Sequence, residues 1–185
     1  YAKKMNIDPE KIYVVAVMPC VAKKFEKTRA DEDASGYPDI DAVITTRELA
    51  KMIKKSGILF KEIPEAKFDS PLGEYTGAGV IFGATGGVME AALRTAVETV
   101  SGKKLENVEF KEVRGFEGIK EATYKAGDVT VNVAVASGLE NASKICEAIK
   151  NGTANYQFVE IMACPGGCIN GGGQPIVDAY TRRNV

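Results

Sequence analysis

Histidine is absent from the 185 residues of this chain. Without imidazole the chain lacks the usual general base at neutral pH, histidine-ligated metal or haem, and any Ser-His-Asp or Cys-His nucleophile. An excess of charge of one sign is also missing, because 24 lysines and arginines nearly balance 25 aspartates and glutamates. No strong field would draw the chain to a polyanion, so we expect no nucleic-acid partner.

Long apolar runs are missing as well. The longest, Tyr13 to Val17 and Val129 to Ala136, are strand-sized, whereas a membrane span needs roughly 20 apolar residues. No segment combines a charged start, an apolar middle and a small-residue cleavage site. We therefore expect no membrane span and a cytoplasmic location, although a truncated chain that begins at Tyr1 does not exclude a periplasmic one.

The composition, 45% hydrophobic and 26% charged, is that of an ordinary folded domain with one core or two small lobes. Hydrophobic periodicity and turn residues predict alternating strands and helices, and therefore an α/β fold with a mainly parallel sheet and flanking helices. A Thr-x-x-Glu capping box at Thr45 predicts the start of a helix that ends at Gly57. We expect strands at 12–17, 42–44, 108–113, 129–136 and 156–162, helices at 87–100 and 139–150, and a long loop at 64–79.

Two of the predicted strands end on a cysteine. Cys20 follows the strand at 12–17, and Cys164 follows the strand at 156–162. Sites in open α/β sheets form beyond the carboxyl ends of the strands, so parallel strands would bring both thiols to one edge. Cys168 follows four residues after Cys164, and the intervening Pro-Gly-Gly allows a tight turn in which two thiolates face one metal centre.

Three thiolates without imidazole favour an iron-sulfur cluster over structural zinc. A cubane needs a fourth ligand, but Cys146 falls within a predicted helix beside Ile145 and Ile149, where we expect it to be buried core. The plainer alternatives are a buried thiol at Cys20 and a disulfide or chance pair at Cys164 and Cys168. So many glycines around the latter two cost folding entropy and argue against mere packing.

The sequence resembles the iron-only (FeFe) hydrogenases over nearly the whole chain, and four stretches carry the resemblance. Two carry the cysteines and match signature motifs of that family's catalytic domain, and two more are similar to it. They are MPCVAKKFE at 18–26, EIMACPGGCINGGGQP at 160–175, FGATGGVMEAALRTA at 82–96 and DAVITTRELA at 41–50. The resemblance implies the C-terminal part of the catalytic (H-cluster) domain of a large subunit, one lobe or one and a part.

The resemblance assigns ligands for the H-cluster. It implies that Cys20, Cys164 and Cys168 hold its 4Fe-4S cubane, and that Cys168 also bridges to the two-iron subsite. The fourth cubane ligand belongs to an earlier family motif, Thr-Ser-Cys-Cys-Pro, and this sequence has no Cys-Cys pair. Residues 1–185 are therefore expected to be a fragment of that domain, inactive alone, with its cluster site empty or holding an adventitious metal.

The same resemblance implies roles around the two-iron subsite. Lys23 would donate a hydrogen bond to a cyanide ligand, Met18 and Met162 would pack against the subsite, and Phe82 and Gly83 would approach the cluster. Each has a plainer alternative: Lys23 as a solvated lysine, the methionines and Phe82 as core fillers. Glu26 completes its motif as a surface charge or as the partner of a nearby lysine.

The function implied for the parent protein is reversible oxidation of hydrogen and reduction of protons. Its expected partners are the remainder of the hydrogenase polypeptide and an electron donor or acceptor, either ferredoxin or a nicotinamide-linked subunit. The rival hypotheses are a hydrogenase-like iron-sulfur protein without the two-iron subsite, which serves assembly or regulation, and a structural zinc-binding module. The glycine-rich loop at 83–87 precedes a helix but lacks the Gly-Lys-Ser/Thr of a phosphate cradle, so a nucleotide site is a weak interpretation.

Overall fold

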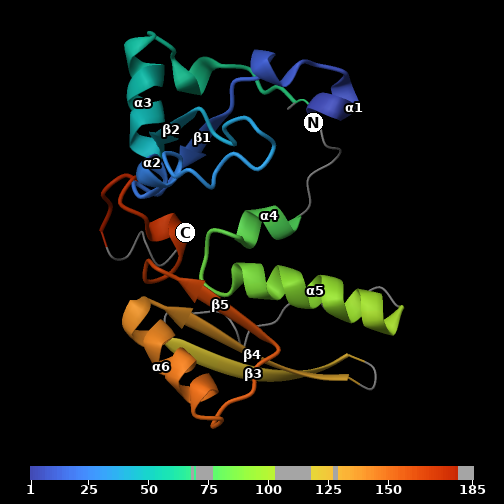
Figure 1. Cartoon of the computed structure of the whole chain (residues 1–185). Coiled ribbons are helices and arrows are strands. Elements are labelled where there is room, and N and C mark those ends of the chain that lie inside the picture. Colours follow the sequence, from blue (N-terminus) through green and yellow to red (C-terminus); the bar gives the residue numbers. More distant parts are fainter. Residues whose placement is uncertain (68, 70–76, 103–117, 127–128, 179–185) are drawn as a thin grey trace. The chain divides into compact units, whose positions relative to one another are not determined.

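The computed structural model describes residues 1–67, 69, 77–102, 118–126 and 129–178 (Figure 1). The chain divides into two compact units. Unit 1 comprises residues 1–75 together with 171–185, and unit 2 comprises residues 76–170. Each unit is described by itself.

Unit 1 contains a parallel sheet of two strands, β1 (Val15–Met18) and β2 (Ala42–Thr45), paired from Val15 opposite Ala42 to Met18 opposite Thr45. Helix α3 (Thr46–Lys55) follows β2 directly. The predicted capping box is confirmed: the Thr45 hydroxyl accepts from the Glu48 backbone N–H at 3.2 Å, and the Glu48 carboxylate accepts from the Thr45 N–H at 2.8 Å. Four short helices complete the described part of unit 1: α1 (Ala2–Met5), η1 (Pro9–Lys11), α2 (Lys23–Glu26) and η2 (Phe60–Glu62).

Strand β1 leaves apolar side chains in solvent. Tyr13, Val15 and Val17 are exposed, and Val43 of β2 is the one fully buried apolar side chain among the described residues of unit 1. The apolar run at 12–17 predicted a strand covered on both faces. That prediction is wrong for this chain, because β1 has one partner strand among the described residues and its alternate side chains have no cover there.

Unit 2 is built on a mixed sheet of three strands, β3 (Ile119–Ala126), β4 (Val129–Ser137) and β5 (Phe158–Met162). Strands β3 and β4 are antiparallel, while β4 and β5 are parallel and are connected through α6 (Leu139–Lys150). Helix α5 (Gly87–Ser101) follows the short α4 (Gly77–Ile81), and a single turn, η4 (Cys168–Asn170), comes after β5.

The core of unit 2 follows the two-residue period of β4. Val133 and Val135 pack with Met89 and Leu93 of α5. The alternate residues, Ala134 and Ala136, pack with Ile145 of α6. Successive side chains of a strand point to opposite faces, so α5 and α6 cover opposite faces of the sheet (Figure 1).

The expected α/β fold, with parallel strand pairs and flanking helices, is confirmed. Two details differ. Strand β3 was not predicted, and β1 and β5 lie in different sheets, so Cys20 and Cys164 do not follow strands of one sheet as we expected. The predicted strand at 108–113 lies outside the described residues, as does much of the loop predicted at 64–79, whose last residues begin α4. None of the helices in the described ranges has the length and apolarity that crossing a membrane requires.

Candidate functional site

The cysteine turn at residues 164–168 begins two residues after β5 ends at Met162. Gly166 and Gly167 adopt φ angles of 81° and 101°, a region that favours glycine because it crowds a β-carbon. The Gly167 N–H donates to the Cys164 carbonyl at 2.9 Å and closes the turn. Cys164 is half-buried and Cys168 is exposed, so the turn presents two thiols four residues apart.

A second loop, residues 83–87, lies against this turn within unit 2. The Ile169 N–H donates to the Gly83 carbonyl at 2.8 Å, and the Thr85 N–H donates to the Gly166 carbonyl at 3.1 Å. A β-carbon on Gly167 would lie 2.5 Å from the Gly83 oxygen and 2.6 Å from the Thr85 nitrogen. The cysteine turn is therefore held by backbone contacts that leave no room for a side chain at Gly167.

Two predicted site residues flank the thiols of unit 2 differently. Met162 is buried, and its sulfur lies 4.0 Å from the Cys168 sulfur. Phe82 is 47% exposed in the segment just before Gly83, so it is not the core filler of the plainer alternative. Unit 2 thus brings Met162 and Gly83 to the cysteine turn and leaves Phe82 with a solvent-facing ring.

Glu160 is a buried residue that the sequence reasoning missed. Its side chain is 5% exposed, and its carboxylate accepts from the Gly86 N–H at 2.7 Å and from the Met89 N–H at 2.6 Å. These are orphan donors at the N-terminus of α5, where the helix dipole favours negative charge. The anion position at this helix start is filled from within the chain, which removes the phosphate-cradle interpretation of the 83–87 loop. The available signal was a glutamate within an otherwise apolar strand, which reads ordinarily as a solvent-facing position.

The third predicted ligand, Cys20, lies in a loop of unit 1. Strand β1 ends at Met18, and the Pro19 carbonyl accepts from the Gly173 N–H at 2.7 Å. A β-carbon on Gly173 would lie 2.9 Å from the Thr45 side chain. Glycine at 173 therefore allows the returning chain to pack beside Pro19. Cys20, the next residue, is half-buried.

Lys23 begins α2, three residues after Cys20. Its ammonium pairs with the Glu26 carboxylate at 2.5 Å, and both side chains are just over one-third exposed. The hydrogen bond to Glu26 raises the pKa of Lys23, burial opposes the rise, and Coulombic attraction to Glu26, Cys20 and Glu32 adds to it. Lys23 is therefore a charged donor beside Cys20 at neutral pH, and Glu26 has the lysine partner expected for it.

The prediction that Cys146 is buried is wrong. Cys146 is exposed on α6, whereas the adjacent Ile145 is 3% exposed and faces the sheet. One residue along a helix rotates a side chain by about 100°, and this turns Cys146 away from the core. Its place on α6 still does not add it to the cysteine turn.

The donor set fits an iron-sulfur cluster better than zinc. All four cysteines lie in the described part of the chain, and no disulfide joins them, which removes the disulfide alternative for Cys164 and Cys168. Within either unit the described residues bring no three cysteine, aspartate or glutamate side chains to metal-binding spacing. Cys164 and Cys168 lie in unit 2 and Cys20 lies in unit 1, and the sequence contains no imidazole. All-thiolate ligation is the chemistry of iron-sulfur clusters.

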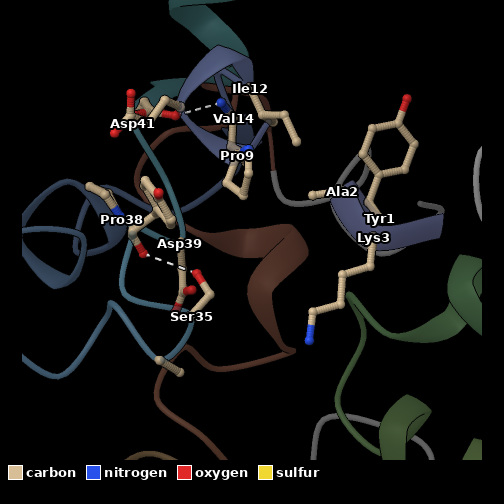
Figure 2. A pocket seen from close by; sticks show the side chains of 13 residues that line it. Tyr1, Ala2, Lys3, Pro9, Ile12, Val14, Ser35, Pro38, Asp39 and Asp41 are labelled. Carbon is tan, nitrogen blue, oxygen red and sulfur yellow. Dashed lines mark hydrogen bonds between the residues drawn. The ribbon is translucent and has the colours of Figure 1, made fainter. Parts of the chain in front are cut away.

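A separate cavity of about 1180 Å³ lies in unit 1 between the N-terminal segment and the loop at residues 34–41 (Figure 2). The Asp41 carboxylate at its wall accepts from the Val14 N–H at 2.6 Å. Its lining includes none of the predicted site residues. The cavity therefore adds nothing to the cysteine site.

A family model described as "Iron only hydrogenase large subunit, C-terminal domain" matches residues 1–172. The chain is 54% identical to the large subunit of the periplasmic Fe hydrogenase of Nitratidesulfovibrio vulgaris, over 95% of this chain and 42% of that protein. It is 50% identical to iron hydrogenase 1 of Clostridium pasteurianum, over 96% and 31%. It is 33% identical to the cytosolic Fe-S cluster assembly factor narfl of Xenopus tropicalis, over 94% and 38%. The chain thus spans less than half the length of each of these relatives.

Solved structures give the same picture. A variant of the FeFe hydrogenase HydA1 from Chlamydomonas reinhardtii matches with a TM-score of 0.74 and 40% identity, over 98% of this chain and 54% of that one. The structure titled with stepwise H-cluster assembly in HydA(deltaEFG) matches with a TM-score of 0.75, also at 40% identity, over 98% and 53%. The fold and the sequence motifs point to the same relatives.

Proposed function

The chain belongs to the iron-only hydrogenase large-subunit family, C-terminal domain, and from this premise we propose that it forms part of the site at which a longer parent protein interconverts hydrogen with protons and electrons. The observation that carries the proposal is the cysteine turn, whose two thiols are presented by a backbone arrangement that tolerates no side chain at Gly167.

In this proposal Cys20, Cys164 and Cys168 would hold a 4Fe-4S cubane, and Cys168 would also hold the two-iron subsite. When bound, this H-cluster supplies the electrons and the metal centre at which protons are reduced. The connectivity of the chain supports a shared cluster: Gly173, which donates to the carbonyl of Pro19 next to Cys20, follows Cys168 by five residues. The fourth cubane ligand comes from a part of the parent protein outside these 185 residues.

The protein's own contribution is to hold and tune the cofactor. Lys23 offers an ammonium donor whose pKa is raised by Glu26, and a donor of this kind suits the strongly polarised nitrogen of a cyanide ligand. Met162, beside Cys168, is a soft apolar wall that excludes water. Met18, at the end of β1, is assigned the same role for the Cys20 half, and Phe82 and Gly83 approach the cluster from the 83–87 side.

A test of Lys23 uses its neighbour as a control. Lys24 pairs with Glu48 at 2.7 Å and is about equally exposed, so Lys24→Met removes a similar charge one residue away. We expect Lys23→Met in the complete protein to lower hydrogen evolution by at least about tenfold and to shift the infrared bands of the cyanide ligands, whereas Lys24→Met leaves both near wild type. Equal effects of the two substitutions would refute a specific role for Lys23.

A second candidate is an iron-sulfur protein that carries a cubane without the two-iron subsite and serves cluster assembly. The relative from Xenopus tropicalis, named as an assembly factor, supports this alternative at 33% identity. The hydrogenase relatives, at 50% and 54%, support the first candidate more strongly. Infrared bands from carbonyl and cyanide ligands after maturation of the complete protein favour a hydrogenase, and their absence favours the assembly function.

Activity of the isolated chain tests the proposed need for a further ligand. We expect the isolated 185 residues to evolve no hydrogen after the same anaerobic maturation that makes the complete protein active. Turnover by the isolated chain would contradict the assignment of the fourth ligand to another part of the parent protein.

The electron partner is proposed to be ferredoxin or a nicotinamide-linked subunit, and a relative named as an NADP-reducing hydrogenase subunit supports the latter.

A further inference from the structure

Glu160 connects the strand that leads to the cysteine turn with the helix that packs beside it. The carboxylate sits on β5, four residues before Cys164, and bridges two backbone N–H groups at the start of α5, those of Gly86 and Met89. Breaking such a hydrogen bond costs free energy, because it leaves a buried polar group without a partner. The buried carboxylate therefore ties β5 to the first turn of α5.

The residues immediately before this helix contact the cysteine turn. Thr85, adjacent to Gly86, donates its N–H to the Gly166 carbonyl, and the Gly83 carbonyl accepts from Ile169. The 83–87 loop is thus held at one end by Glu160 and at the other by the turn that follows Glu160 in the chain. Hydrogen bonds therefore connect β5 to the 83–87 loop through the Glu160 carboxylate, and connect that loop to the cysteine turn, which follows β5 in the chain.

Another buried carboxylate, that of Glu90, lies on α5 itself. Glu90 is fully buried and pairs with Arg94, one turn further along the same helix. Its ion pair spans adjacent turns of one element and does not reach β5 or the cysteine turn through that contact. Substituting Glu90 therefore removes a buried carboxylate while it keeps the hydrogen bonds of Glu160 to Gly86 and Met89, and the two substitutions distinguish the loss of a buried carboxylate from the loss of these two bonds.

We propose that Glu160 is a positioning residue that sets the orientation of the Cys164 and Cys168 thiols by clamping the 83–87 loop between α5 and the cysteine turn. The expected effect on cluster binding rests on the proposed function. The structural effect does not, because the clamp consists of contacts within unit 2. Substituting Glu160 is expected to loosen residues 163–169 while the sheet and both helices persist.

The test compares Glu160→Gln with Glu90→Gln in the complete protein. Glutamine keeps the shape of the side chain but turns an NH₂ group towards one of the two N–H donors, so only one hydrogen bond survives. Hydrogen exchange of the peptide covering residues 163–169, measured before iron is added, is expected to accelerate about tenfold in Glu160→Gln and to stay at the wild-type rate in Glu90→Gln. After reconstitution, iron release to a chelator is expected to be at least about tenfold faster in Glu160→Gln alone.

Each result decides something. Unchanged exchange at 163–169 in Glu160→Gln, or equal acceleration in both variants, would overturn the proposal, since the first denies the link and the second reduces it to general destabilisation. If Glu160→Gln does not fold, Glu160→Asp keeps the charge with a shorter reach. Hydrogen exchange at 163–169 in Glu160→Asp is then expected to be faster than in the wild type, by less than about tenfold. An unchanged rate would overturn the proposal. Wild-type protein that takes up no iron would count against the proposed function, while the exchange measurement would still decide the role of Glu160.

Discussion

The two cysteine-bearing halves of this chain differ in how much of their shape they define themselves. In unit 2, the turn of Cys164 and Cys168 is fixed by hydrogen bonds to the 83–87 loop and stands at the end of a sheet covered by a helix on each face. In unit 1, the Cys20 loop follows a two-stranded sheet whose β1 side chains are half exposed. A two-stranded sheet has little stability of its own. The comparison indicates a cysteine turn in unit 2 that is fixed by contacts within its own unit, and a Cys20 loop in unit 1 that follows a sheet with little cover among the described residues.

Substituting the packed glycine of each half should break the comparison most strongly. Gly167→Ala combines a φ of 101° with a β-carbon 2.5 Å from a backbone oxygen, so we expect a loss of about 3–4 kcal/mol in the free energy of unfolding. Gly173→Ala places a β-carbon 2.9 Å from the Thr45 side chain and 3.0 Å from the Pro19 carbonyl carbon, but without a positive φ, and should cost about 1–3 kcal/mol.

Gly152→Ala is the control for backbone conformation in these denaturant titrations. It has a φ of 70° and no atom within 4 Å of the added β-carbon, so it should cost about 1 kcal/mol. A cost of Gly167→Ala no larger than that of Gly152→Ala would show that the turn is not packed as described.

A second pair of substitutions tests the core of unit 2 at adjacent positions of α6. Ile145→Ala removes a buried side chain that packs on Ala134 and Ala136, with an expected loss of about 3 kcal/mol. Cys146→Ala, one residue on and exposed, should change stability by less than about 0.5 kcal/mol. Thermal or denaturant unfolding measures both, and a large cost at Cys146 would restore the prediction that this thiol is core.

Helix α3 offers a smaller test in unit 1. Thr45→Ala removes the N-cap of the capping box and is expected to cost about 1 kcal/mol. Thr46→Ala, at the first helical position, serves as the matched control and should cost clearly less. The effect is best read as faster hydrogen exchange across residues 46–55, and equal exchange in the two variants would contradict the role of the cap.

Acid should weaken the same helix start by the smallest amount. Hydrogen bonds from Lys24 and from the Thr45 backbone lower the pKa of Glu48 from 4.5 to about 2. A carboxylate with a lowered pKa stabilises the fold above its unfolded pKa, and that contribution fades as the pH falls from about 4.5 to about 2. The stability difference between wild type and Glu48→Gln should shrink across this range, and a difference independent of pH would exclude this ion pair as its source.

Local patterns in the sequence predicted the elements whose signals lie within one segment. The capping box at Thr45, helix α5, strand β4 and helix α6 were found from periodicity and end residues. Strand β3 was missed because Lys120, Glu121 and Lys125 interrupt its apolar pattern, and its formation depends on pairing with β4. The burial of Cys146 was misjudged because Ile145 and Ile149 suggested a wider apolar face, whereas Ile149 is itself exposed.

The candidate site shows the same division between local and distant signals. The cysteines and glycines of the turn could be recognised from their spacing, because the turn is built from five consecutive residues. The role of Glu160 could not, since its partners Gly86 and Met89 lie 74 and 71 residues away in the chain. The pairing of Lys23 with Glu26 was within reach because both residues lie on one short helix.

We propose that Cys20, Cys164 and Cys168 hold one iron-sulfur cluster. The direct measurement is the iron and acid-labile sulfide content of the reconstituted complete protein with each cysteine replaced by serine in turn. We expect Cys20→Ser, Cys164→Ser and Cys168→Ser each to lose most of the cubane, and Cys146→Ser to retain the wild-type content. Full retention in Cys20→Ser, or loss in Cys146→Ser, would contradict the ligand assignment.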